Sequence, residues 1–417
     1  IKAPKMTRGS TMSGEMMPVP TVCATLRPKN KKAMKLKKLV LPVLSFGLAL
    51  FVSGLLVAFS DSKVLALKGA PLEMLQKALS TAGGAYWALF RGSIFDPQLA
   101  QDRFIEGFYP FSETLVAATP LILTGLSVAL AFKAGLFNIG AQGQFIAGAI
   151  GASWVGFTFE LPVVIHTLAA MAAAIGFAGI YGGLVGLLKA RTGAHEVIVT
   201  IMLNYVAAYF LLWLLSTTAF LRPGRQDPLA PEVRESAQLP HLFGEDLRAN
   251  LGFIIALIAA GAVWWLLNRS TWGFRFRAVG ANADASRTAG ISVARVTTTV
   301  MFIAGALAGL GGAMQILGSE PAMTAGIGGS FGFDAITVAL LGRSKPIGVL
   351  AAGVLFGALR AGAVIMQANQ KVPIDIVLIV QSLVVLFIAA PPLVRFMFGL
   401  ADPAKKAAKA AAKGAAA

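Results

Sequence analysis

The sequence predicts an all-α fold, a polytopic transmembrane helical bundle of about ten spans that includes one short broken helix. Hydrophobic residues make up 56% of the 417 residues, charged residues only 13%, and the mean hydropathy is +0.73. A water-soluble domain of this length could not carry such a composition on its surface. The chain also holds 45 glycines, which suit membrane helices whose backbones pack in close contact.

Ten apolar runs are the candidate spans. Nine have roughly the twenty residues that cross a bilayer as a helix. The run 331–341 would form a helix of only about 17 Å, and Arg343 and Lys345 follow it closely. We therefore expect a broken helix, which is tolerated where protein or a water-filled cavity satisfies its backbone. The ten runs are 39–59, 115–132, 136–157, 163–188, 197–220, 251–267, 297–317, 331–341, 347–366 and 374–390.

Basic residues indicate how the spans are oriented. The loop 269–296 carries five arginines against the single acid Asp284, and an excess of positive charge is typical of cytoplasmic loops. This orientation places both termini in the cytoplasm and makes 61–112 an external segment, in which we expect an amphipathic helix at the membrane interface. The arginines of the loop are Arg269, Arg275, Arg277, Arg287 and Arg295.

Three regions follow along the chain. We expect a disordered, basic, cytoplasmic N-terminal segment over 1–38, a transmembrane domain over 39–395 and an Ala/Lys-rich cytoplasmic tail over 396–417. Met34 opens the lysine-rich run before the first span, as a natural N-terminus would. The residues before it could therefore belong to an extended reading frame.

Composition and motifs exclude several classes of function. The single cysteine, Cys23, rules out a disulfide framework, a cysteine-based zinc site and an iron–sulfur cluster. The histidines lack metal-ligand spacing, and no Gly-Lys-Ser/Thr sequence is present to form a Walker loop. The net charge of +17 lies in tails and loops, as topology requires, so a nucleic-acid partner is not expected. We expect no cofactor, no metal and no catalytic residue.

A glycine- and carboxamide-rich stretch, Gly135 to Gln144, joins two apolar runs. Amide and phenol groups can hydrogen-bond a neutral hydroxylated or heterocyclic solute, but they also hold membrane helices together. Both interpretations stay open for these side chains, and we place the stretch in the early part of the third span. The candidate substrate-pathway residues are Asn138, Gln142, Gln144, Asn204 and Tyr205.

Few ionisable residues lie inside the apolar runs. The main ones are Asp334, Arg360 and Asp375. An ion-coupled carrier needs intramembrane carboxylates or unwound cation sites, so this scarcity argues against one. We favour an Asp334–Arg360 pair that stabilises packing of the short span over an ion relay.

Three blocks of sequence carry a resemblance to a known family. They are Ala118 to Gly125 leading into Gly135 to Gln144, His195 to Tyr205, and Phe276 to Asn282 with Ala289 to Ile291. These blocks resemble the permease subunits of bacterial ABC importers of the branched-chain amino acid, ribose and nucleoside type, most closely those of the nucleoside (simple sugar) permeases. The similarity extends over roughly 39–395, although Gln142 stands where this subgroup is expected to carry Glu. The resemblance implies the bacterial inner membrane, a separate ABC ATPase subunit, a second permease subunit (homologous or identical) and an extracytoplasmic solute-binding protein.

The loop from Gly273 to Arg295 resembles the segment that couples such permeases to their ATPase. A short helix from Ala283 to Ala289, with breaks at Gly280 and Gly290, fits that interpretation. The alternative is a basic loop that serves only topology. The candidate coupling residues are Arg277, Gly280, Asn282, Ala285, Ala289 and Gly290.

The function expected from these features is that of a permease subunit of an ABC importer, which passes nucleosides across the inner membrane and is powered by a separate ATPase. The chain itself would not be an enzyme. Ribose or another simple sugar is the alternative substrate, because hydroxyl groups suit the same amides. A self-sufficient secondary carrier or channel for a small polar solute is the alternative of another class.

Overall fold

The computed structural model describes residues 31–370, apart from 61–63, 65, 68, 102 and 245, and part of 376–398. The main helices are α1 (Lys31–Ser60), α3 (Pro71–Arg91), α4 (Tyr109–Lys133), α5 (Ala141–Thr158), α6 (Val163–Thr192), α7 (Glu196–Leu215), α8 (Gly252–Arg269), α9 (Thr271–Ala281), α10 (Ala283–Thr288), α11 (Val293–Gly318), α12 (Phe331–Leu341), α13 (Pro346–Gln370) and α15 (Pro391–Met397). Short 3-10 turns cover Leu99–Gln101, Phe104–Phe108 and Glu235–Ala237.

The predicted helical membrane bundle is confirmed. Six helices of the described residues are long and apolar enough to cross a bilayer. Nine of the ten predicted runs fall on helices, and α12 has the predicted bounds of the short helix. The tenth run, 374–390, lies largely outside the described residues, as do 1–30 and the tail from 399. Helix α1 begins at Lys31, so it includes 31–38, which we expected to be disordered.

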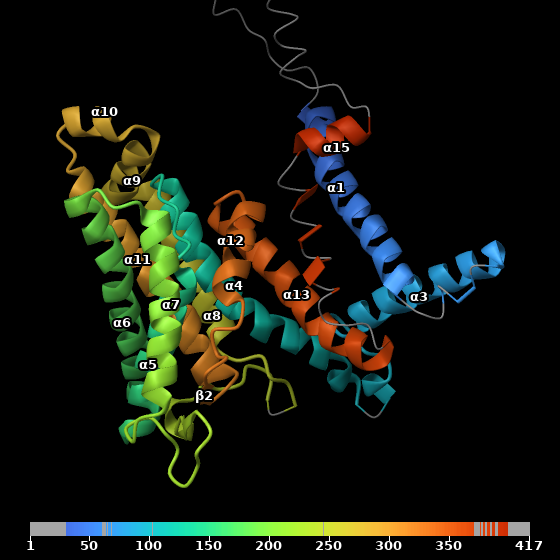
Figure 1. Cartoon of the computed structure of the whole chain (residues 1–417), viewed down its shortest axis with the longest axis horizontal. Coiled ribbons are helices and arrows are strands. Elements are labelled where there is room, and N and C mark those ends of the chain that lie inside the picture. Colours follow the sequence, from blue (N-terminus) through green and yellow to red (C-terminus); the bar gives the residue numbers. More distant parts are fainter. Residues whose placement is uncertain are drawn as a thin grey trace, which may run out of the picture.

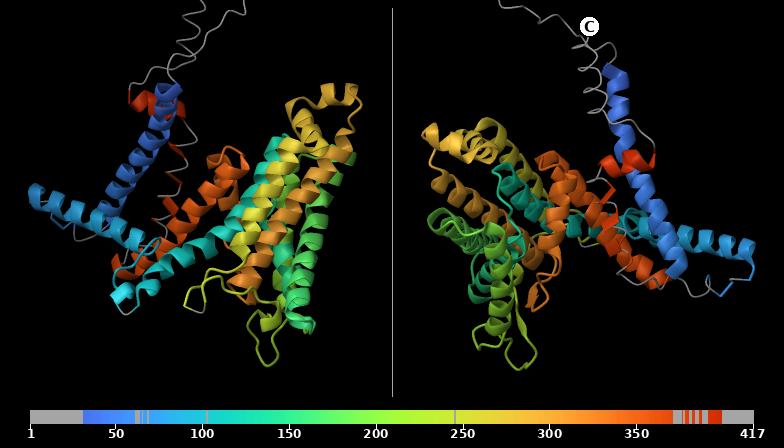
Figure 2. Two further views of the ribbon diagram at one scale, coloured as in Figure 1. Left: turned by 180° about the vertical axis from the view of Figure 1, so that it is seen from behind. Right: turned by 45° about the horizontal axis from the view of Figure 1, so that its top comes forward.

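Helices α4 and α11 form the centre of the bundle. In the span that contains α4, 83% of the most apolar window is buried, and in α11 78%. The corresponding shares are 22% in α7 and 28% in α6 and α8, which therefore form the outer layer. Helices α1, α3 and α15 lie apart from the bundle of α5 to α11, and α4 and α13 connect the two parts (Figures 1 and 2).

Glycines allow the central helices to approach closely. A Cβ atom on Gly148 of α5 would lie 2.2 Å from the Cα of Gly309 on α11, and one on Gly305 would lie 2.2 Å from the carbonyl oxygen of Ala178 on α6. Any larger residue would force these backbones apart, which costs packing energy. The high glycine content is therefore used, in part, for contact between helix backbones.

Two local predictions need correction. Helix α5 begins only at Ala141, because Gly135 (φ 72°) turns the chain and 136–140 form a non-helical connection. Asn138 therefore lies before the span rather than in it. Helix α7 ends at Leu215, five residues before the predicted end. The loop after it contains β1 (Leu229–Glu232), which pairs in antiparallel fashion with β2 (Ala322–Thr324) before α12, a pairing we did not predict.

Candidate functional site

Asn138 and Gln144 hold each other at the start of α5. The Asn138 side-chain amide donates to Oε1 of Gln144 at 2.8 Å, and the Gln144 amide donates to Oδ1 of Asn138 at 3.2 Å. Both side chains are 1% exposed. Burial of an amide is costly unless it is hydrogen-bonded. The two hydrogen bonds between Asn138 and Gln144 offset that cost, and they also connect the segment before α5 to its first turn.

Asn204 connects α7 to the same turn. Its side-chain nitrogen donates to the Ile139 carbonyl at 3.0 Å, and its Oδ1 accepts from the Gly143 backbone N–H at 2.8 Å. The first N–H groups of any helix lack partners within that helix. A residue distant in sequence therefore caps the first turn of α5.

Gln142 performs the corresponding task for the broken helix α12. Its Oε1 accepts from the Gly332 backbone N–H at 2.6 Å, and its Nε2 donates to the Gly329 carbonyl at 3.0 Å. The chain enters α12 through Gly329, whose φ of 42° favours glycine. A Cβ on Gly332 would lie 2.3 Å from the Gln142 backbone nitrogen, so this contact requires glycine. The predicted need of the short helix for protein partners at its end is met here.

The structure thus brings four of the five candidate pathway residues together. We call Asn138, Gln142, Gln144 and Asn204 the amide cluster; it joins α5, α7 and the start of α12. Tyr205 is 59% exposed and its hydroxyl forms no hydrogen bond with the described residues. It therefore stands outside the cluster.

Arg360 of α13 and Asp334 of α12 form a charged pair within the spanning region. Their charged atoms are 3.9 Å apart, and the Ser330 hydroxyl donates to Asp334 at 2.7 Å. The guanidinium carbon of Arg360 lies 4.0 Å from the centre of the Phe331 ring, a cation–π geometry. Its Nη1 is buried and has no hydrogen-bond partner among the described residues. The sequence indicated the ion pair but not the aromatic ring.

The candidate coupling segment projects beyond the bundle. Helices α9 and α10 extend past the ends of the neighbouring helices (Figure 1). Ala285, Ala289 and Arg277 are exposed. Asn282 separates the two helices and caps α10, because its side chain accepts from the Ala285 N–H at 2.9 Å. Gly290, with φ 78°, follows the end of α10 as expected.

Gly280 is not a break, contrary to our prediction. It lies inside α9, and a Cβ there would come within 2.6 Å of the Lys133 carbonyl oxygen and 2.9 Å of the Gly135 nitrogen. Gly280 therefore serves close packing of α9 on the turn after α4. The asparagine N-cap signal at Asn282 would have located the break correctly.

Comparisons with known proteins agree with the permease features. A family model described as the branched-chain amino acid transport system permease component matches residues 111–389. The guanosine ABC transporter permease protein NupP of Bacillus subtilis (strain 168) is 42% identical over 81% of this chain and 93% of its own length.

Two further relatives differ in substrate name. The nucleoside ABC transporter permease protein NupB of Lactococcus lactis is 36% identical over 72% of this chain and 83% of its own. The glucose ABC transporter permease protein TsgB13 of Haloferax volcanii is 34% identical over 77% of this chain and 86% of its own. No solved structure gives a significant match.

Proposed function

Because the chain belongs to the family of branched-chain amino acid transport system permease components, we propose that it is the subunit through which an ABC importer passes nucleosides. The observation that carries this proposal is the 42% identity to a guanosine permease over nearly the whole length of that relative. A second relative with a nucleoside in its name supports the same substrate class.

The pathway would run beside the start of α12. The amide cluster holds this glycine-rich start in place from α5 and α7 through hydrogen bonds to Gly329 and Gly332. Irregular backbone at membrane depth is tolerated where it lines a cavity or is buried in protein. In this proposal Asn138, Gln144 and Asn204 shape the wall of the pathway. Tyr205, exposed on α7, would reach a solute only across an interface with another subunit.

ATP hydrolysis would occur in a separate ATPase subunit that binds α9 and α10. The support is the exposed, acid-poor surface of these helices, whose residues Arg277, Asn282, Ala285, Ala289 and Gly290 are accessible. Gly280 would contribute by packing α9 on the turn after α4, from which the chain continues into the connection that contains Asn138.

Two further partners follow from the proposal that the chain is an ABC importer permease. A second permease subunit would complete the pathway, and an extracytoplasmic solute-binding protein would deliver the substrate. We place the chain in the bacterial inner membrane, with the basic loop 269–296 and both termini in the cytoplasm.

A simple sugar is the second candidate substrate, since a relative named for glucose is 34% identical. Uptake by the complete transporter in proteoliposomes separates the two. Labelled guanosine, cytidine, ribose and glucose should be compared, each delivered by the cognate binding protein. Nucleoside uptake that excess unlabelled ribose does not inhibit supports the proposal. Uptake of ribose or glucose without uptake of nucleosides would overturn the substrate but leave the transporter class intact.

A further inference from the structure

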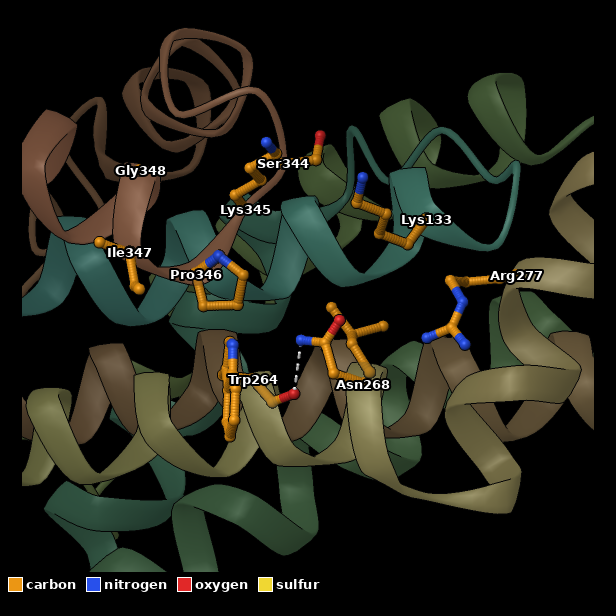
Figure 3. A pocket seen from close by; sticks show the side chains of 10 residues that line it. Lys133, Trp264, Asn268, Arg277, Ser344, Lys345, Pro346, Ile347 and Gly348 are labelled. Atoms are coloured by element: carbon orange, nitrogen blue, oxygen red, sulfur yellow. Dashed lines mark hydrogen bonds between the residues drawn. The ribbon is translucent and has the colours of Figure 1, made fainter. Parts of the chain in front are cut away.

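A cleft of about 410 Å³ opens at the end of the bundle where α4 and α8 finish and α13 begins. Its size falls within the roughly 300–1,000 Å³ of typical ligand sites. Figure 3 shows Lys133 and Arg277 on one side of the cleft, and Trp264, Pro346 and Ile347 on the other. The residues come from four separate segments of the chain, so the cleft exists only in the folded protein.

The cleft carries uncompensated positive charge. Lys133, Arg277 and Lys345 line it, and its lining contains no acidic residue. None of the three forms an ion pair or side-chain hydrogen bond with another described residue. Three cations around one space repel one another unless an anion lies between them. Charge complementarity therefore calls for an anionic ligand.

The opposite side of the cleft is apolar and faces outward. Ile347 is 71% exposed and Trp264 is 43% exposed, and both belong to helices that are long and apolar enough to span a membrane. Tryptophan is enriched at the headgroup level of bilayers. A ligand that fills the whole cleft would therefore place its anionic part against the lysines and its apolar part along α8 and α13.

The backbone beside the cleft is held in an unusual conformation. Arg343 and Ser344 have φ values of 53° and 50°, which non-glycine residues rarely adopt. The turn is fixed by bonds from the Ser344 N–H to the Ala339 carbonyl at 2.8 Å and from the Lys345 N–H to the Gly342 carbonyl at 3.1 Å. Lys345 therefore lies on a turn that is fixed by backbone hydrogen bonds, not on an open loop.

We propose that this cleft binds the phosphate headgroup of an anionic phospholipid, with the acyl chains along Trp264 and Ile347. Basic pockets between membrane helices bind such headgroups. Free phosphate would neutralise the cations but leave the apolar side chains of Trp264 and Ile347 uncovered. An acidic segment of a protein partner would likewise neutralise the charges without covering these side chains. The site does not depend on the transported substrate. It shares Arg277 with the proposed ATPase contact, so among the cleft residues the test alters only Lys133 and Lys345.

The test uses the full-length chain in nanodiscs of phosphatidylcholine alone and of phosphatidylcholine mixed with phosphatidylglycerol, followed by native mass spectrometry of the retained lipids. Phosphatidylglycerol should be retained preferentially and should raise the melting temperature. The variant Lys133→Gln/Lys345→Gln should bind it about twenty-five-fold more weakly, since each basic residue contributes roughly fivefold. Arg295→Gln removes an exposed charge at the start of α11, outside the cleft, and should leave binding unchanged.

Four results would overturn the proposal. The first is equal retention of both lipids by the unaltered chain, a measurement for which no variant has to fold. The second is an equal loss of binding in Arg295→Gln, which would indicate diffuse surface charge. The third is full stabilisation by inorganic phosphate in pure phosphatidylcholine, which would assign a free anion. The fourth is an unchanged lipid preference in the double variant together with weaker binding of the ATPase subunit, which would assign the cleft to a protein partner.

Discussion

The amide cluster lies at the start of a span and the Arg360–Asp334 pair lies within one, and the polar groups of the two are hydrogen-bonded to different degrees. Each of the four amides both donates and accepts a hydrogen bond. Arg360 has a buried Nη1 without a partner among the described residues and contacts Asp334 only at 3.9 Å. The amides therefore fix one backbone geometry, whereas the ion pair contributes mainly by neutralising two charges.

The largest effect on stability is expected from Gln142→Leu. The substitution leaves the Gly332 N–H and the Gly329 carbonyl without their partner. Each unsatisfied buried group costs about 1–3 kcal/mol, so the loss should be about 3 kcal/mol. Thermal unfolding in detergent measures it. Tyr205→Phe is the control, because this hydroxyl has no partner among the described residues, and it should change stability by less than about 0.5 kcal/mol. Equal melting temperatures of the two variants would show that the hydrogen bonds of Gln142 do not stabilise the fold.

The next effect is expected at the ion pair. Arg360→Met alone leaves the Asp334 carboxylate without its cation and with the Ser330 hydroxyl as a hydrogen-bond donor. It should cost about 2 kcal/mol, below the range for fully buried pairs because Arg360 is partly exposed. The double variant Arg360→Met/Asp334→Leu should be more stable than the single one, because no charge is left behind. A double-mutant cycle by thermal unfolding measures the coupling. Purely additive losses would show that the two charges act independently.

A smaller effect is expected outside the spans, at Arg91 and Asp96. Burial raises the pKa of the Asp96 carboxyl, but hydrogen bonds from Arg91 and the Gln98 N–H, with the Arg91 charge, outweigh it and lower the pKa overall. The pKa of an aspartate in the unfolded chain is about 4. Because the pKa of Asp96 is lower in the folded protein, its carboxylate stabilises the fold at any pH above about 4, and this stabilisation is lost as the pH falls below that value. Asp96→Asn should cost about 1 kcal/mol at neutral pH and flatten the acid limb of a stability profile. An unchanged acid limb would contradict this assignment.

The smallest effect on stability, with a large effect on activity, is expected on α10 and at Ala289, which caps its C-terminal end. Ala285→Trp and Ala289→Trp enlarge exposed side chains that have no packing role, so melting should shift by less than about 0.5 kcal/mol. Because α10 is the proposed ATPase contact, nucleoside-stimulated ATP hydrolysis should be lost in the assembled transporter. Arg287→Trp, on the same helix, tests whether the effect is confined to the alanine positions. Normal stimulation in the two alanine variants would remove α10 from the coupling interface.

The sequence predicted the parts of the fold that depend on local signals. The bounds of α12 follow from a glycine-rich approach and from Gly342 at its end, and hydrophobic length identified the long helices. The bond from Gln142 to Gly332 could not be predicted, because it joins residues 190 positions apart. The pairing of β1 with β2 and the convergence of Lys133, Arg277 and Lys345 depend on tertiary packing for the same reason.

Uptake of labelled nucleoside into proteoliposomes, with and without the ATPase subunit, tests whether this chain is the permease of an ABC importer. Uptake should require the ATPase and ATP inside the vesicles and the binding protein outside, and it should stop when ATP hydrolysis is blocked. The chain alone should transport nothing under a proton or sodium gradient. Gradient-driven uptake by the purified chain alone would exclude an ABC permease and identify a self-sufficient carrier.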